Sequence, residues 1–364
     1  MLPRCTHQRE LPDSTRPAAM NPVALLDLAR RGDKDAFERL AEPCRGEIQL
    51  HCYRMLGTIH DAEDLVQDTF VRAWQSIDHF EERASFRSWL YRIATNACLN
   101  SLKLRSRMRR YLPESCGPAA EHMPGTQPAT DVAWLEPYPD SALENIADST
   151  PQPDTRFESH EFVRLAFVAA IQHLPPRQRA ALLLHDVLGW SAEESARLLD
   201  ASVAAVNGAL QRARATLRKR VPPPGVTSSP PTDRQLALID RYMRCWENMD
   251  VDGFVNLLRE DAVLSMPPWR EWYAGRHRIG DLFLWTARPG GHGPFRLVRT
   301  AANRQPAFAF YCRQQGRGWM AHSIQVIDLD GDSIAAMTSF VTPSLFHAFG
   351  LPDAMPIQSA LSEP

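Results

Sequence analysis

Apolar residues recur at helical spacing through the first third of the chain. In segment 60–74 small or apolar side chains repeat at intervals of three and four, which predicts a helix with one buried stripe. That stripe consists of Ala62, Leu65, Val66, Thr69, Phe70, Ala73 and Trp74. Segment 85–110 shows the same spacing at Leu90, Ile93, Ala94, Ala97 and Leu102. The first unit is therefore expected to be all-helical.

Helix start and stop signals divide residues 174–220 into short helices. Two prolines at 175 and 176 suit a helix start, and Gly189 suits a helix end. Ser191 and Glu194 then form a capping box ahead of a second helix. A turn at 200–202 leads to a last helix with apolar residues on one face, where Asp200 tolerates the left-handed backbone often given to glycine. This order predicts a helix-turn-helix, with a plain helical hairpin as the alternative.

The pattern changes class beyond residue 231. Leu236, Ile239, Met243 and Trp246 form one helical stripe, and segment 253–261 is expected to be a second helix. Alternating polar and apolar residues then predict strands, with a turn at 330–332. These strands are 295–301, 307–313, 321–328 and 334–341. The last unit is therefore expected to be an α+β domain with helices packed on a curved antiparallel sheet.

Proline content places the boundaries between these units. Segment 111–155 holds eight prolines and little periodicity, which predicts an extended tether without a core of its own. A second proline-rich tether covers 222–233. The expected organisation is a disordered tail 1–22, helical units 23–110 and 156–221, and an α+β domain 234–364. Met20 is a plausible alternative start. No apolar run is long enough for a membrane span, so a cytoplasmic protein is expected.

Charge is segregated along the chain, although the net charge is only −2. Residues 20–82 carry seven Lys/Arg and thirteen Asp/Glu, whereas 83–110 carry eight basic residues and no acid. Residues 111–155 hold eight acids and no Lys or Arg, and 156–220 hold ten basic and six acidic groups. Such segregation indicates different partners for different segments. The seven cysteines lack a C-x-x-C pair, so no metal site and no cofactor are expected.

Two polar faces stand out in the first unit. The outer face of helix 60–74 presents Asp61, Glu63, Asp64, Gln67, Asp68 and Arg72, for which a solvated helix face is the alternative. The next helix combines aromatic rings with cations and amides, as a single-strand binder needs to hold phosphates and stack bases. Its candidate residues are Arg87, Trp89, Arg92, Asn96, Asn100 and Lys103, with Arg105, Arg107, Arg109 and Arg110 continuing that side. Core packing is the alternative for Trp89 and for Phe86.

The last helix of the helix-turn-helix carries candidate duplex contacts. Its outward side chains near the start would meet base edges, and the arginines that follow would meet phosphates. The candidates are Ser202, Ala204, Ala205, Asn207, Gln211, Arg212 and Arg214, with Arg218 further along.

Three motifs in order resemble a known family. DAEDLVQDTFVRAW, FRSWLYRIATNACLN and, past the tether, LPPRQRAALLLHDVLGWSAEESARLLDASVAAVNGALQRARATL look like a bacterial sigma factor of the extracytoplasmic-function group. The resemblance covers about 25–220 and implies a factor that directs core RNA polymerase to promoter DNA. It assigns the acidic face of 60–74 to the polymerase clamp helices. Residues 80–103 would open the minus-ten element, with bases flipped from the stack, and 202–214 would read the minus-thirty-five element as duplex.

The acidic tether gains a hypothesis from this resemblance. A flexible chain of net charge −8 can occupy a basic channel built for nucleic acid until the transcript displaces it, and a solubilising linker is the alternative. Segment 133–140 is an exception within the tether. Its Trp134, Leu135 and Tyr138 are expected to dock on a neighbouring domain.

Residues 234–364, with the MPP and WYAG pieces near 266–275, look like a SnoaL-like cone-shaped domain. Such domains are appended to some sigma factors of this group, including the mycobacterial sigma-G type. Because the SnoaL-like family also contains isomerases and cyclases, a pocket is conceivable around Trp269, Trp272, Tyr273 and His322, with Asp261, His292 and Tyr311 as further candidates. A role in regulation, by contact with the helical units or by ligand sensing, is preferred over catalysis.

Three hypotheses from different classes follow: a sigma factor, a conventional helix-turn-helix repressor or activator, and an enzyme with a nucleic-acid-binding appendage. Only the first explains why 23–110 combines an acidic docking face with a basic aromatic one. Its expected partners are core polymerase and promoter DNA, with a small-molecule ligand or an anti-sigma protein as further candidates. The protein is not expected to be an enzyme or to contact a membrane.

Overall fold

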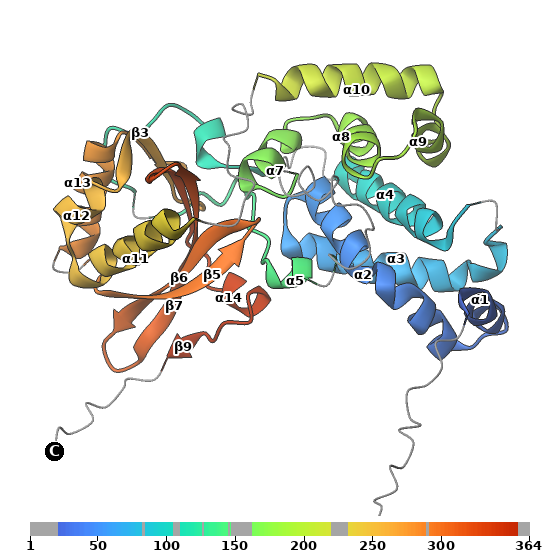
Figure 1. Ribbon diagram of the computed structural model, residues 1–364, viewed down its shortest axis with the longest axis horizontal. Helices are drawn as coiled ribbons and strands as arrows, with labels where there is room; N and C mark the ends of the chain where they lie inside the picture. Colours follow the sequence, from blue (N-terminus) through green and yellow to red (C-terminus); the bar gives the residue numbers. More distant parts are fainter. Residues whose placement is uncertain are drawn as a thin grey trace, which may run out of the picture.

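The computed structural model describes residues 21–81, 84–104, 110–125, 127–144, 146, 162–219, 232–288 and 291–355. Helices form one side of the molecule and a sheet with its own helices forms the other, while α10 lies across the top of the view (Figure 1). The fold is thus a pair of all-helical units followed by an α+β domain, as the sequence predicts.

The first helical unit follows the apolar spacing closely. Its elements are α1 (Pro22–Arg30), α2 (Lys34–Leu56), α3 (Ile59–Gln75), the 3-10 turn η1 (Ile77–His79) and α4 (Phe86–Leu104). Gly57, with φ of 81°, ends α2, and Thr58 caps α3 by accepting a hydrogen bond from the Asp61 amide. The prediction that the last helix reaches residue 110 is wrong. Arg110 lies in a short strand, and Arg105, Arg107 and Arg109 lie outside the described residues.

The linker after α4 is packed against its neighbours. It contains β1 (Arg110–Tyr111), η2 (Pro113–Ser115), β2 (Ala133–Trp134), which pairs in parallel with β1, and α5 (Ser141–Glu144). Leu135 and Tyr138 are 1% and 0% exposed and belong to the helical core. The linker packs on the core of the helical units and not on one of its own, so the prediction of an extended tether fails where it forms β1, β2 and α5. The docking of Leu135 and Tyr138 is confirmed.

The second helical unit has the predicted caps and turn. Its elements are α7 (Leu165–Gln172), α8 (Pro176–Leu182), a π-helical turn η4 (Leu183–Val187), α9 (Ala192–Leu199) and α10 (Val203–Leu217). Both hydrogen bonds of the Ser191–Glu194 capping box form. Asp200 takes the left-handed conformation, with φ of 48°, so the tight turn needs no glycine. The helix-turn-helix is confirmed in α9 and α10.

The C-terminal domain packs helices on one face of a sheet. The helices are α11 (Asp233–Asn248), α12 (Val251–Val255) and α13 (Arg276–Ala287). The strand order is β4-β3-β8-β7-β6-β5, with β9 beside β7. The strands are β3 (Leu258–Ser265), β4 (Trp272–Ala274), β5 (Phe295–Ala302), β6 (Gln305–Gln314), β7 (Gly318–Asp330), β8 (Ser333–Phe340) and β9 (Ala354–Met355).

Two expectations for this domain are wrong. The helix expected over 253–261 ends at Val255, because strand alternation begins at Leu258, with Ala262 and Leu264 buried on one face. The sheet is mixed, because β3 pairs in parallel with β8 while the hairpins remain antiparallel. No tight turn joins β3 to β8 in the chain, so nothing local forces them to be antiparallel.

The two faces of the sheet belong to two different cores. On β6, Phe308 and Phe310 face the core formed with α11, α12 and α13, whereas Ala307, Ala309 and Tyr311 join the core of the helical units. This alternation follows the two-residue period of a strand. α14 (Leu345–Ala348) covers part of the same face. The helical units, the linker and the C-terminal sheet therefore share one continuous apolar core.

Candidate nucleic-acid interface and interdomain junction

The outer face of α3 is polar and exposed. Its buried stripe at Ala62, Val66 and Phe70 turns the other side of the helix to solvent. The exposed residues of this face are Glu63, Asp64, Gln67, Asp68, Val71 and Arg72. Arg72 pairs with Asp68 at 2.9 Å, so most of the negative charge on this face stays uncompensated. Five of the six residues predicted for this surface lie on it together.

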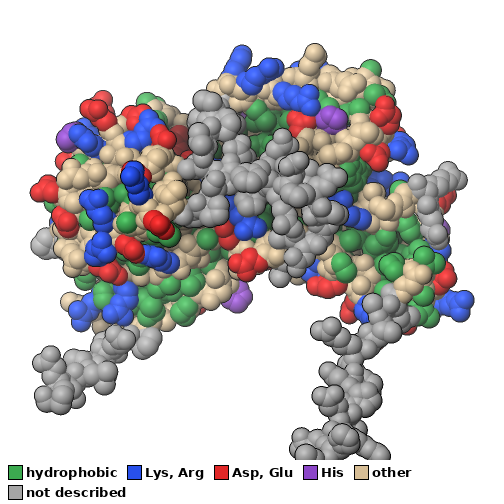
Figure 2. All heavy atoms as spheres, viewed as in Figure 1, with side chains coloured by type: hydrophobic (Ala, Val, Ile, Leu, Met, Phe, Trp, Pro, Cys, Tyr) green, Lys and Arg blue, Asp and Glu red, His purple; other side chains and the backbone are tan. Residues whose placement is uncertain are grey.

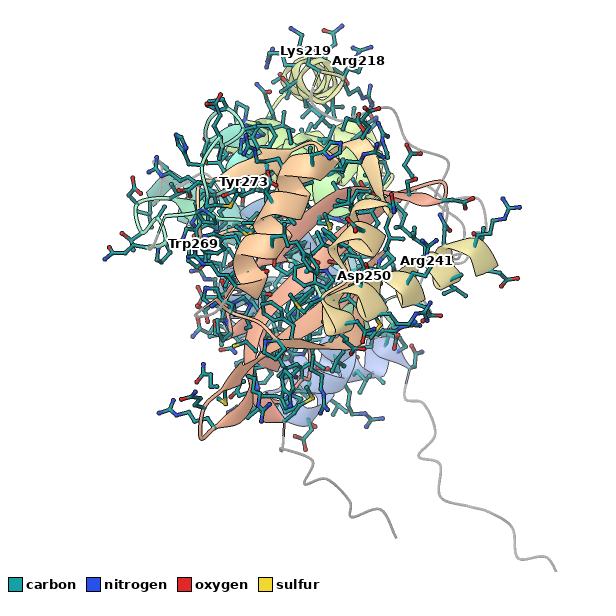
Figure 3. All side chains as sticks on the ribbon, turned by 90° about the vertical axis from the view of Figure 1, so that its left-hand side faces the viewer. Arg218, Lys219, Arg241, Asp250, Trp269 and Tyr273 are labelled. Carbon is teal, nitrogen blue, oxygen red and sulfur yellow. The ribbon has the colours of Figure 1, made fainter. Side chains whose placement is uncertain are left out.

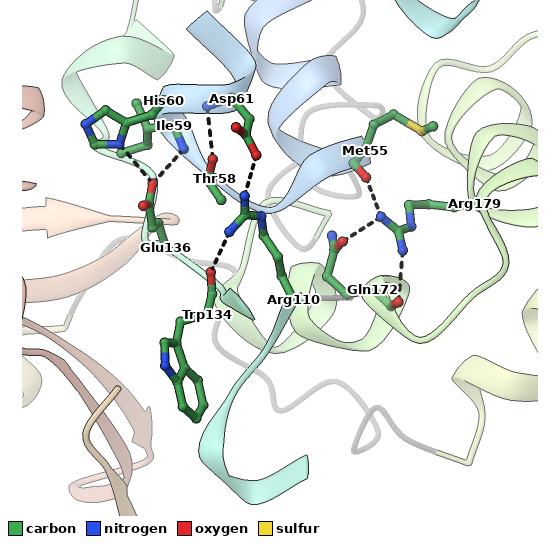
Figure 4. Close-up of polar contacts among 10 residues, drawn as sticks. All are labelled: Met55, Thr58, Ile59, His60, Asp61, Arg110, Trp134, Glu136, Gln172 and Arg179. Carbon is green, nitrogen blue, oxygen red and sulfur yellow. Dashed lines mark hydrogen bonds and ion pairs between the residues drawn. The ribbon is translucent and has the colours of Figure 1, made fainter. Parts of the chain in front are cut away.

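Asp61, the sixth, is held by the linker. Its carboxylate forms an ion pair with Arg110, which also donates to the Trp134 carbonyl at 3.3 Å (Figure 4). In the same first turn of α3, the Glu136 carboxylate accepts the Ile59 amide at 3.0 Å and lies 3.4 Å from His60 Nδ1. An anion at this place satisfies free amides at the start of α3. The linker thus fastens the N-terminus of the acidic helix.

The predicted strand-binding residues of α4 separate into two groups. Arg87, Arg92, Asn96, Asn100 and Lys103 are exposed. Arg87 pairs with Glu47 at 2.5 Å. Trp89 is only 8% exposed, and its ring packs with Phe80 and Phe86 at centroid distances of 5.0 and 5.7 Å. Its place is the aromatic core behind the polar face, so the ring offers little surface for base stacking in this arrangement.

The C-terminal part of the polar side of α4 lies beside the second helical unit. Asn96, Asn100 and Lys103 line a pocket of about 610 Å³ whose other wall is the start of α8. Tyr91 on α4 also meets Trp190, before α9, with ring centroids 5.6 Å apart. Buried Arg179 of α8 joins the units by donating to the Met55 carbonyl and to Gln172 Oε1 (Figure 4). The two helical units are therefore in a closed arrangement.

The last helix of the helix-turn-helix, α10, is open on its outer side. Ser202 caps it by accepting from the Ala205 amide at 3.1 Å, and Val206, Leu210 and Ala213 are buried against the unit. All seven candidate side chains are exposed: Ser202, Ala204, Ala205, Asn207, Gln211, Arg212 and Arg214. Lys and Arg side chains gather along this helix at the top of the surface in Figure 2. Figure 3 shows Arg218 and Lys219 pointing away from the rest of the molecule.

Asn303, at the tip of the β5–β6 hairpin, joins three parts of the chain. Its amide nitrogen donates to the Tyr53 hydroxyl at 3.1 Å and to the Val163 carbonyl at 2.8 Å, and its amide oxygen accepts the Tyr138 backbone N–H at 2.9 Å. Asn303 is fully buried, with φ of 56°. Beside it, Gln305 accepts the Leu165 amide at 2.9 Å. The C-terminal domain thus ties α2, the linker and the start of α7 together.

The aromatic residues predicted to line a C-terminal pocket hold the linker instead. Trp269 donates to the Gly125 carbonyl at 3.0 Å, Trp272 to the Gly117 carbonyl at 2.9 Å, and Tyr273 to the His122 carbonyl at 3.1 Å. Arg270, in the same loop, pairs with Asp131 in the linker. Trp269 and Tyr273 lie on the side of the domain along which the linker runs (Figure 3). Trp269, Trp272 and Tyr273, called the clasp below, thus hold an extended segment of the linker by its main-chain carbonyls.

His322 is not part of that clasp. It lies on β7, which β8 and β3 separate from β4, and its ring is 5.3 Å from His292 and 5.5 Å from Phe295. Burial and neighbouring His292 lower the pKa of His322 to about 4. The side of the sheet under the helices is filled by rings of Tyr242, Trp246, Phe254, Phe283 and Phe310. The four predicted pocket residues are therefore not brought together.

The sequence did not indicate that Asn303, Gln305 and Tyr53 join the domains. A local signal is the asparagine of Asn303-Arg304 between two strands, since asparagine favours hairpin turns with positive φ and both residues adopt it. Within the described residues, no group of three or more His, Cys, Asp or Glu is arranged to hold a metal ion. Nor does any helix in the described ranges have the length and apolar character needed to cross a membrane.

Known proteins resemble all three parts of the chain. Family models match residues 40–109 as sigma-70 region 2, 164–217 as sigma-70 region 4 and 239–337 as a SnoaL-like domain. The ECF RNA polymerase sigma factor SigG of Mycobacterium tuberculosis is 42% identical over 328 residues, covering 90% of this chain and 86% of that protein. SigW of Bacillus subtilis is 31% identical over 196 residues, covering 53% of this chain and 92% of that protein.

The arrangement of the domains also has a solved counterpart. The crystal structure of the extracytoplasmic function sigma factor SigJ of Mycobacterium tuberculosis matches with a TM-score of 0.57 at 21% identity, over 85% of this chain and 98% of that one. This match supports the fold, while the similarity to SigG extends through region 2, region 4 and the C-terminal domain. The chain belongs to the ECF sigma factors of RNA polymerase.

Proposed function

We propose that this sigma factor engages core RNA polymerase and promoter DNA through three surfaces of its helical units. Exposed Glu63, Asp64, Gln67, Asp68 and Arg72 on α3 dock on the polymerase. Exposed Arg87, Arg92, Asn96, Asn100 and Lys103 on α4 hold the separated strand of the minus-ten element, with Trp89 supporting this face from the core. The outer side of α10, from Ser202 to Arg214, reads the minus-thirty-five element.

The charge distribution supports this assignment. An acidic face orients docking on a basic partner, and its effect is largest on the association rate. Cations on α4 and α10 neutralise DNA phosphates, so salt weakens their binding steeply through counterion release. Base edges in the major groove are within reach of short polar side chains such as Asn207 and Gln211. A cytoplasmic location follows from this role, because polymerase and promoter lie there.

The C-terminal domain regulates this activity by intramolecular contact. The observation that carries the proposal is Asn303, whose amide bonds α2, the linker and the segment before α7 at once. While these bonds hold, Asn96, Asn100 and Lys103 share a pocket with the start of α8, so a DNA strand can lie along the whole face of α4 only after the helical units separate. The domain therefore favours a closed, less active state.

The linker is the second element of this intramolecular regulation. In the closed state three of its acids are engaged locally: Asp131 with Arg270, Glu136 with the start of α3, and Asp140 with the Arg304 amide. Once released from these contacts, the same acids are available to a basic polymerase channel. Boundaries near 110, 155, 221 and 233 separate the parts that move. A small-molecule ligand or an anti-sigma protein that favours one state would act on this equilibrium.

Promoter opening tests the proposal. Core polymerase and the full chain are incubated with promoter DNA, and permanganate reports unpaired thymines. We expect Asn96→Ala with Lys103→Ala to reduce opening while binding to core polymerase is retained, and Gln211→Ala to weaken duplex binding. The control Arg241→Ala, on the far domain, should change neither. Equal opening by all variants would exclude these surfaces.

A further inference from the structure

The pocket between α4 and α8 has the composition of a ligand site. Its volume of about 610 Å³ lies within the range of small-molecule pockets. Leucines and prolines from both helical units line part of it. The polar lining consists of the amides Asn96, Asn100 and Gln172 and the cations Lys103, Arg110, Arg177 and Arg179. No acidic residue is among the described residues that line it, so their net charge is positive.

Two of the four cations are available to a ligand. Arg110 is paired with Asp61, and Arg179 donates to main-chain carbonyls around it. Lys103 and Arg177 are exposed and make no ion pair within the part of the chain that the structure describes. Both line the pocket, Lys103 from the end of α4 and Arg177 from the start of α8. An anion between them would therefore bridge the two helical units.

The remaining lining indicates what the anion is attached to. Asn96 and Asn100, four residues apart on one helix, present amide donors and acceptors on the same face. Leu99, Leu102 and Leu174 supply apolar surface beside them. A flat heterocycle with hydrogen-bonding edges uses both kinds of contact. An alkyl chain would bury the amides without partners, which is costly.

We propose that this pocket binds a nucleoside phosphate, with the phosphate between Lys103 and Arg177 and the base against the leucines and the Asn96 and Asn100 amides. Such a ligand binds only while α4 and α8 are together, so it shifts the population toward the closed state. It also occupies residues proposed to hold the minus-ten strand. This regulatory consequence rests on the proposed function, whereas the binding itself does not.

Binding is measured by calorimetry on the full chain with ADP, which polymerase does not incorporate. Adenosine supplies the base alone, pyrophosphate the anion alone, and hexyl phosphate an anion on an alkyl body. We expect saturable one-to-one binding of ADP, and at least tenfold weaker binding of each of the other three. Arg177→Glu should weaken ADP binding by about tenfold or more, the effect of removing one charged contact. The control Arg241→Glu makes the same charge change on α11 and should bind as the wild type does (Figure 3).

Initiation assays connect binding to activity. ADP should reduce open-complex formation by the wild type but not by Arg177→Glu, which without ADP should initiate as the wild type does. Three results would overturn the inference. They are the lack of saturable ADP binding, an equal loss of ADP affinity in Arg177→Glu and Arg241→Glu, and binding of a minus-ten single strand but of no mononucleotide. If the wild type initiates normally and ADP does not bind, the inference alone fails. If ADP binds and no promoter is opened, the proposed function fails instead.

Discussion

Replacing Asn303 with glycine removes its own three side-chain hydrogen bonds and leaves the other contacts between the domains in place. Glycine accepts the φ of 56° without strain, and the backbone bond from the residue 303 amide to the Tyr138 carbonyl, 2.8 Å long, can persist. Three buried hydrogen bonds are lost, to Tyr53, Val163 and Tyr138. At about 1 kcal/mol each, the closed state loses about 3 kcal/mol. That corresponds to a roughly 100-fold shift toward open molecules.

Hydrogen exchange and run-off transcription measure this shift. Amides of 135–140 and of the last turn of α2 should exchange faster in Asn303→Gly, and initiation with core polymerase should rise. Arg304→Gly is the matched control, because residue 304 has a φ of 57° in the same turn and its hydrogen bond to Asp140 comes from its backbone amide. Unchanged exchange and unchanged initiation in Asn303→Gly, or equal changes in both variants, would refute the role of the junction.

Three further predictions concern separate parts of the molecule. Asp64→Arg on the acidic face should weaken binding to core polymerase about tenfold in a pull-down titration, while Glu38→Arg on α2 should not. Equal affinities of Asp64→Arg and the wild type would show that α3 is not part of the docking surface. Burial lowers the pKa of His51 to about 3 from 6.5, so the unfolded state takes up the proton first and stability should fall as pH drops below 6.5, by about 1.4 kcal/mol per pH unit. Urea unfolding should show this loss in the wild type but not in His51→Gln, and parallel pH curves would contradict it. Burial raises the pKa of Glu114 above 4.5, so the ionised carboxylate opposes folding. Glu114→Gln should therefore have a higher melting temperature than the wild type at pH 7, and this difference should vanish below pH 4.5. Equal melting temperatures at both pH values would contradict the burial argument.

Local patterns predicted most of the elements. Helical spacing located α3 and α4, the Ser191–Glu194 capping box located α9, and alternation located β5 to β8. These signals lie within a few residues of each other, so a single sequence carries them. Trp89 shows where they become ambiguous, because an aromatic ring on the border of a helical stripe fits both a core and a binding face.

The parts that could not be predicted depend on long-range contacts. Asn303 and Tyr53 are 250 residues apart in the chain, and β3 and β8 pair across most of the C-terminal domain. High proline content also concealed the packing of the rest of the linker, such as the pairing of β1 with β2, since Pro residues interrupt any helical or strand period. Leu135 and Tyr138 were the predicted exception. The clasp of Trp269, Trp272 and Tyr273 donates to main-chain carbonyls, whose positions no residue type reveals.

Run-off transcription by purified full-length protein with core RNA polymerase is the most direct test of the account. On a library of promoter fragments, the account predicts initiation at a defined set of sequences sharing a minus-ten and a minus-thirty-five element. It also predicts that Asn303→Gly raises the yield at those same sequences, since the surfaces that choose them are intact. Absence of promoter-dependent initiation, by both the wild type and Asn303→Gly, would contradict it.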